Sequence, residues 1–179
     1  MIDLSMAELR EITAYAVACA EPALTIYERI RPLDHRPRSA INAARAFANG
    51  ANRTKAIRDS AWAAHRAYQE TRDAGQTAAS EAARAAVATA GTPFLHPIAK
   101  ATQVRHILGP AAHTARACEL DADDNPDVGA NYIRKATDLA TPTVTNVLTR
   151  YPNAPSTRNR VGQLLRDLDT ALRHPPTAR

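Results

Sequence analysis

The chain has 179 residues, of which 39 are alanine and only 8 are aromatic, and its net charge is +5. Strands favour aromatic and β-branched side chains, whereas alanine and arginine are strong helix formers, so this composition argues against a β-sandwich, a β-barrel or a Rossmann sheet. No stretch forms a basic tail, and a modest, dispersed positive excess is typical of a solvated surface. We therefore predict an all-α protein.

Capping residues and helix breakers divide the chain into seven or eight predicted helices. The first runs over residues 6–30, where Ser5 and Glu8 form a capping box at its start and Pro22 predicts a kink or a break. In the fifth helix, the Gly109-Pro110 pair predicts a second kink or break. The helices after the first are expected at about 37–49, 54–74, 77–90, 98–119, 126–139, 142–150 and 156–174.

These helices are expected to form one compact bundle with an alanine-rich core over residues 1–179. Residues 5–120 make up its larger part. Residues 121–174 add the C-terminal helices, and Ser156 is expected to cap the last of them. The tail of residues 175–179 is expected to fray.

The compartment is predicted from what the chain lacks. Its first residues show no basic segment followed by an apolar core, and no run of about 18 apolar residues occurs anywhere in the chain. We therefore expect a soluble cytoplasmic protein with no membrane partner. Cys19 and Cys118 each lie in an alanine-rich helical stretch, which predicts two buried free thiols and no disulfide framework.

Common cofactor and nucleophile motifs are missing from the sequence. All six glycines are isolated, so neither a Gly-x-Gly-x-x-Gly nor a Walker sequence is present, and no Gly-x-Ser-x-Gly occurs. His106 and His113 lie two helical turns apart, roughly 10 Å, which is too far for the two side chains alone to hold one ion. We therefore expect no metal site and no cofactor.

The most prominent polar cluster comprises Asp34, Arg36, Arg38 and Arg45, with His65 downstream. Arg38 and Arg45 are seven residues apart on one predicted helix and so point the same way, while Asp34 precedes that helix, where the dipole favours a carboxylate. The cluster either pins the loop between the first two helices or forms a polar pocket or partner-facing patch. We expect Arg38 to pair with Asp34 and Arg45 to need another partner or a bound anion. Replacing Arg36 should leave stability nearly unchanged and weaken partner binding if that side chain faces outward.

The segment from Arg31 to Gly50, RPLDHRPRSAINAARAFANG, resembles the signature of the immunity-protein-five-like family. Further similar segments are Ala63-Ala64-His65, Ala88-Thr89-Ala90 and His106-Ile107-Leu108-Gly109. The resemblance covers about residues 5–120. It departs from the family's uninterrupted helix at residues 91–97, and Thr102 stands where a histidine is expected. The family implies an all-helical bacterial protein and an immunity role in a toxin system.

Three functions follow from these observations. The first is an immunity-type protein that binds and neutralises a cognate bacterial toxin by occlusion, with no chemistry of its own, through Asp34, Arg36, Arg38 and Arg45. The second is a small helical enzyme or ligand-binding protein, in which Arg38 and Arg45 hold an anionic substrate in an interhelical pocket and a histidine transfers a proton. Its candidate catalytic residues are His65, His106 and Asp34.

The third function is non-specific nucleic-acid binding. The cations on and near the third predicted helix do not share one face, so we expect at most weak, salt-sensitive and sequence-independent binding. A deep closed pocket that joins Arg45, His65 and His106 would favour the enzyme. A flat exposed patch would favour the immunity protein, and a single arginine stripe would favour the nucleic-acid binder.

Overall fold

A computed structural model describes residues 1–175, and this part of the chain consists of α-helices and two short 3-10 turns with no strand. The all-α prediction is therefore confirmed. The elements are α1 (Met6–Ile30), α2 (Arg36–Ala48), α3 (Lys55–Asp73), α4 (Thr77–Gly91), η1 (Thr92–Phe94), η2 (Ala101–Gln103), α5 (Val104–Asp121), α6 (Pro126–Leu139), α7 (Pro142–Thr149) and α8 (Arg160–Arg173).

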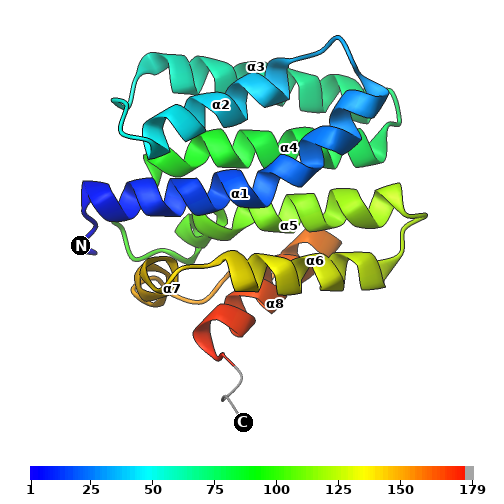
Figure 1. The fold of residues 1–179 in the computed structure, drawn as a ribbon. Coiled ribbons are helices and arrows are strands. Elements are labelled where there is room, and N and C mark those ends of the chain that lie inside the picture. The colour runs from blue at the N-terminus through cyan, green and yellow to red at the C-terminus, as the bar shows by residue number, and fades with distance from the viewer. Residues whose placement is uncertain (176–179) are drawn as a thin grey trace.

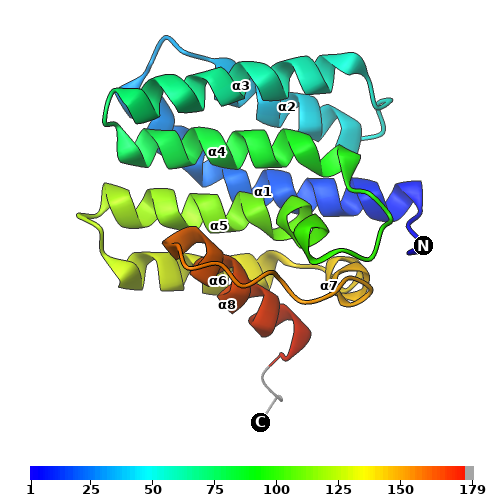
Figure 2. The ribbon, with the colours of Figure 1, turned by 180° about the vertical axis from the view of Figure 1, so that it is seen from behind.

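The helices stack in layers with α4 and α5 side by side in the middle (Figure 1). α1 crosses both of them on one face, and α3 flanks α4. α2 covers α1 and α3, whereas α6 and α8 cover α5 at the other end of the stack, as the opposite view also shows (Figure 2). α4 and α5 are thus the scaffold on which the other helices pack.

Alanine allows this close stacking. Seven of the nine buried residues of α4 are alanines, and α5 buries four more. Small side chains let neighbouring helix axes approach, and a methyl group added at Gly109 of α5 would lie 3.6 Å from the Ala88 side chain of α4. Larger side chains fill the space around this centre, and the most deeply buried include Tyr27, Phe47, Ile12, Ile41, Ile107 and Leu108. The alanine-rich core is confirmed.

Local capping signals position most helix starts as predicted. Ser5 accepts a hydrogen bond from the Glu8 amide at 3.2 Å, and the Glu8 carboxylate accepts one from the Ser5 amide at 2.8 Å, which completes the capping box. Asn125 and Thr141 cap α6 and α7 by accepting a hydrogen bond from the Asp127 and Val144 amides, respectively. Cys19 is buried as predicted, whereas Cys118 is half-buried.

Two predicted helix starts differ in the structure, and of the kink or break predicted at Pro22 and at Gly109-Pro110 neither helix shows a break. α1 is continuous through Pro22 and bends near its middle (Figure 1), and α5 is continuous through Pro110. α5 begins at Val104 rather than at residue 98, because the extended backbone of Lys100 interrupts the helical path. α8 begins at Arg160, because Asn159 and not Ser156 accepts the capping hydrogen bond, from the Gly162 amide at 2.8 Å.

Two remaining predictions concern the ends and the membrane. The predicted frayed tail lies outside the described residues, except for Pro175. Among the helices of residues 1–175, none combines the length and the apolar character that crossing a lipid bilayer requires.

Candidate functional site

The predicted polar cluster begins in the loop between α1 and α2, where Asp34 binds Arg36 rather than Arg38. The Asp34 carboxylate accepts hydrogen bonds from Arg36 Nε at 2.9 Å, from Arg36 Nη2 at 2.7 Å and from the Arg36 amide at 3.1 Å. It also accepts one from the hydroxyl of buried Tyr27 at 2.6 Å. These contacts, with the Arg36 guanidinium first among them, hold the pKa of Asp34 well below its usual range.

The predicted Arg38–Asp34 pair is therefore wrong, and its physical reason is side-chain direction. Arg36 is the first residue of α2 and its side chain folds back over the loop, whereas Arg38 reaches α1 and binds Glu28 through Nε at 2.5 Å and Nη2 at 2.6 Å. Arg36 also does not simply face outward, because its Nη1 donates to Glu70 of α3 at 2.9 Å.

Arg45 has a partner within the protein as well. It binds Glu21 of α1 and Asn42 of its own helix, so a bound anion is not needed to neutralise it. The four predicted binding residues thus form three separate ion-pair groups that fasten α2 to α1 and α3. This arrangement favours the interpretation that the cluster pins the loop and its helix, and His65 lies elsewhere.

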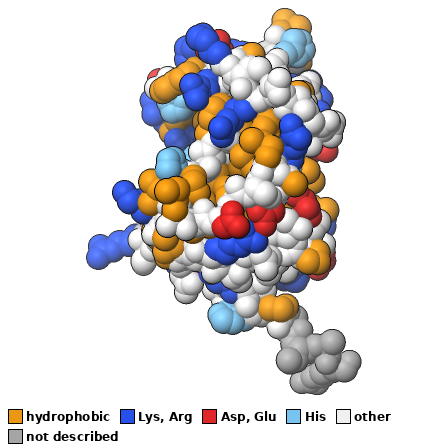
Figure 3. Space-filling model, turned by 90° about the vertical axis from the view of Figure 1, so that its left-hand side faces the viewer, with side chains coloured by type: hydrophobic (Ala, Val, Ile, Leu, Met, Phe, Trp, Pro, Cys, Tyr) orange, Lys and Arg blue, Asp and Glu red, His pale blue; other side chains and the backbone are white. Residues whose placement is uncertain are grey.

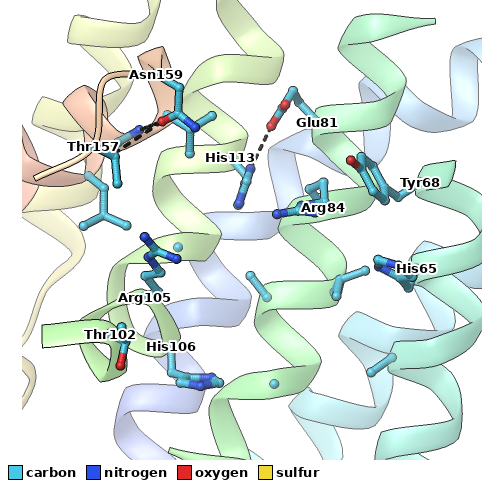
Figure 4. Close-up of a pocket in the computed structure, with 18 of the residues that line it drawn as sticks. His65, Tyr68, Glu81, Arg84, Thr102, Arg105, His106, His113, Thr157 and Asn159 are labelled. Carbon is cyan, nitrogen blue, oxygen red and sulfur yellow. Dashed lines mark hydrogen bonds and ion pairs between the residues drawn. The ribbon is translucent and has the colours of Figure 1, made fainter. Parts of the chain in front are cut away.

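A different set of residues lines an open cleft of about 840 Å³ beside α3, α4 and α5 (Figure 4). The loop before α8 and the start of α8 form its remaining wall. The cleft brings together His65 of α3 and His106 of α5, two of the three residues predicted for an enzyme, and adds His113 of α5. It does not include Asp34 or Arg45.

Small residues on the facing helices leave room for this cleft. Ala61 of α3, Ala88 and Gly91 of α4 and Gly109 of α5 all line it. A methyl group at Gly91 would lie 3.5 Å from Nδ1 of His106, so the imidazole packs directly against the end of α4. Burial lowers the pKa of His106, and contact with the Gly91 backbone opposes this effect only in part, so the ring is neutral near pH 7.

One acid–base pair crosses the cleft between α4 and α5. Nδ1 of His113 lies 2.7 Å from Oε2 of Glu81, and both side chains are largely shielded from solvent. Arg84 is one helical turn beyond Glu81 and points into the same space, as Arg105 does from the start of α5 (Figure 4). Histidine, carboxylate and guanidinium groups therefore converge on one hollow.

An aromatic ladder on α3 forms another side of the cleft. Trp62, His65 and Tyr68 follow one another at three-residue spacing, with ring centroids 5.9 Å and 5.4 Å apart. The guanidinium of Arg84 lies 4.7 Å from the centroid of the Tyr68 ring. Trp62 is 64% exposed, and tryptophan, tyrosine and arginine are the side chains most enriched at binding hot spots.

Sequence reasoning named His65 and His106 but missed Glu81, Arg84 and Arg105 as site residues. One signal could have indicated the first two. They are the only charged side chains between residues 77 and 91, in a helix that is otherwise alanine, threonine, serine, valine and glycine. Nothing local shows that Arg105 joins them, because the packing of α5 on α4 decides that.

On the face of the molecule that Figure 3 shows, the basic side chains do not gather into one stripe. On the end of the molecule that Figure 3 shows, blue side chains are scattered among hydrophobic, acidic and uncharged ones. Ten lysine and arginine side chains, about half of the cations in residues 1–175, form ion pairs with carboxylates. In the same residues, no group of three or more histidine, cysteine, aspartate and glutamate side chains could hold a metal ion.

The fold and the site define an all-α bundle with an open cleft that is lined by histidine, arginine and aromatic side chains. Residues 3–142 match the model of the family described as "Imm-5 like putative immunity protein", and the chain belongs to this family. The match confirms the resemblance and extends its C-terminal end from about residue 120 to residue 142, so that it includes α6. No curated protein and no solved structure is significantly similar to the chain.

Proposed function

We propose that the protein is an immunity protein, which binds a cognate toxin and blocks it by occlusion without chemistry of its own. The family match over residues 3–142 carries this proposal. The structure supports it with an exposed concave surface of the composition that protein partners use. There the exposed Trp62 lies against His65, and Tyr68 and Arg84 follow further along the cleft.

We place the toxin on the cleft rather than on the patch of Asp34, Arg36, Arg38 and Arg45. The guanidinium groups of that patch are already bound by carboxylates of α1, α3 and the loop, and a partner would have to compete with these contacts. Trp62, by contrast, exposes most of its surface, and its burial by a partner gains free energy without breaking an ion pair.

The test uses the product of the gene next to this one as the toxin. We expect the purified pair to form a complex and the immunity protein to rescue cells that express the toxin. Trp62→Ala should weaken the complex by about tenfold or more, since hot-spot truncations typically cost about 2 kcal/mol. Leu33→Ala is the matched control, because Leu33 is 91% exposed and lies in the loop of the alternative patch.

Opposite results would overturn the placement or the function. Loss of binding in Leu33→Ala with full binding in Trp62→Ala would move the interface to the α1–α2 loop. A neighbouring gene product that is toxic, yet neither binds nor is neutralised, would refute the immunity role.

One observation favours a ligand-binding protein or enzyme as the second candidate function. The cleft gathers His65, His106 and the His113–Glu81 pair with two arginines, which is the kind of arrangement that binds a small anion. Non-specific nucleic-acid binding has weaker support, because many of the described cations are paired and those on the face in Figure 3 are dispersed.

A further inference from the structure

Arg84 differs from the other shielded arginines of the protein. Residues 1–175 contain ten half-buried arginines, and nine of them donate hydrogen bonds to a carboxylate, an amide or a backbone carbonyl. Arg84 alone has no such acceptor in this part of the chain, and its guanidinium contacts the ring of Tyr68 instead. A guanidinium presents five N–H groups, so this side chain has donors available for a ligand.

Those donors remain accessible. In the described residues, the buried side-chain polar atoms that lack a hydrogen-bond partner do not include any nitrogen of Arg84, so these nitrogens are not sealed from solvent. Figure 4 shows the Arg84 side chain directed into the cleft. Arg105 enters from the opposite side and also has no carboxylate within ion-pair distance in residues 1–175. His113 lies between the two (Figure 4).

The charge of the cleft is unbalanced. Within the described residues, Glu81 is the one acidic side chain among those that line it, and its carboxylate is bound to His113. Two guanidinium groups therefore face a shared space without a counter-ion of their own chain. Paired guanidinium groups match the planar and tetrahedral oxyanions of carboxylates and phosphates.

The remaining lining is suited to an aromatic group. The ladder of Trp62, His65 and Tyr68 runs along the α3 side of the same cleft. A volume of about 840 Å³ lies within the range of small-molecule sites, which combine apolar walls with a few polar anchors.

We propose that the cleft binds an aromatic phosphomonoester, with the phosphoryl group between Arg84 and Arg105 and the ring against Trp62 and His65. Binding of the phosphoryl group by Arg84 and Arg105 does not depend on the proposed immunity role. A bound ligand would, however, cover the same surface as the toxin. A ligand of this class would therefore compete with a toxin that docks on Trp62.

Trp62 makes the test direct, because it is the single tryptophan of the chain. Tryptophan fluorescence and calorimetry would follow titrations with adenosine monophosphate and phenyl phosphate, each compared with its dephosphorylated form, adenosine or phenol. We expect saturable binding of at least one phosphomonoester, and about tenfold weaker binding of the dephosphorylated form, since charge-assisted hydrogen bonds are lost.

Two variants separate the anion subsite from general charge effects. Arg84→Gln and Arg105→Gln should each weaken binding of the phosphomonoester by about tenfold. Arg66→Gln is the matched control, because Arg66 is an exposed arginine of α3, the helix that carries the aromatic ladder, and does not line the cleft. Arg105 is exposed, so its substitution tests the site even if Arg84→Gln lowers the melting temperature.

The proposal is overturned if neither phosphomonoester saturates at millimolar concentration. It is also overturned if each phosphomonoester binds no better than its dephosphorylated form, or if Arg66→Gln weakens binding as much as Arg84→Gln and Arg105→Gln. Each of these results leaves the immunity role standing, which depends on the complex with the toxin. If the protein binds a phosphomonoester but forms no complex with the toxin, the phosphomonoester site stands and the immunity role is refuted.

Discussion

Replacement of Asp34 by alanine tests whether the predicted polar cluster is part of the fold. The change removes the acceptor of three hydrogen bonds from Arg36 and of one from Tyr27. Arg36 retains Glu70 and gains access to water, so the larger cost falls on Tyr27, which is 1% exposed. An unsatisfied buried hydroxyl costs about 1–3 kcal/mol, and the lost contacts to Arg36 add to this, so we expect a total of about 2–3 kcal/mol.

For a domain of this size, each kcal/mol lowers the melting temperature by about 2–4 °C, so Asp34→Ala should melt roughly 4–12 °C below the wild type. Urea denaturation gives the free energy of unfolding directly. Tyr27→Phe removes the donor, and we expect Asp34→Ala to cost about 1 kcal/mol less in that background, because the two residues share one hydrogen bond.

Asp34→Asn is the control for charge, because it preserves the shape of the side chain and an acceptor oxygen. It should be less destabilising than alanine. A loss below about 0.5 kcal/mol for Asp34→Ala, or strictly additive effects with Tyr27→Phe, would refute the structural role. The cluster would then be available again as a candidate partner surface.

Two further predictions concern buried ionisable groups. Glu119 is fully buried and binds Arg116 and Arg160. Glu119→Gln should therefore lower the free energy of unfolding by about 3 kcal/mol in urea denaturation and loosen the packing of α8 on α5. An effect below about 1 kcal/mol would contradict this. The pKa of His106 lies below its unfolded value near 6.5, so the unfolded state binds the proton first and stability should fall as the pH drops below that value. His106→Gln should reduce this slope in denaturation curves at several pH values, and an unchanged slope would exclude the assignment.

The helices were predictable because their signals are local. A capping box at Ser5 and Glu8, and the caps at Asn125 and Thr141, depend only on residues within one turn of the helix start. The misplaced cap of α8 shows the limit of the same signals. Ser156 and Asn159 are both good capping residues, and only the packed loop shows that Asn159 reaches the Gly162 amide.

The site was less predictable because it depends on packing between helices. Sequence spacing placed Arg38 and Arg45 on one face correctly, yet it could not show that the nearest carboxylates in space are Glu28 and Glu21 of α1. The cleft has the same origin, since alanines and glycines that look like ordinary core residues leave a hollow where α3, α4 and α5 meet.

The wall of the cleft before α8 provides a last prediction, because it lies beyond the range of the family match. Thr157 and Asn159 line the cleft there, and the side chains of both lie close to Gly162 at the start of α8. A methyl group at Gly162 would overlap Oγ1 of Thr157 and lie 2.8 Å from its Cβ and 2.9 Å from Oδ1 of Asn159. Gly162→Ala should therefore push this wall away from α8.

We expect Gly162→Ala to lower the free energy of unfolding in urea denaturation by about 1–3 kcal/mol, which is typical of overpacking. It should also weaken binding of the toxin or the phosphomonoester in the cleft. Thr157→Gly removes the overlapping atoms, so the double variant should recover most of the lost stability, although the altered wall should still bind less well. If Gly162→Ala and the wild type have equal stability, the loop is not held against α8. If stability falls and the double variant recovers none of it, Thr157 is not the residue that Gly162 accommodates. The expected pattern, in which stability recovers and binding does not, would show that residues outside the family match shape the binding surface of this protein.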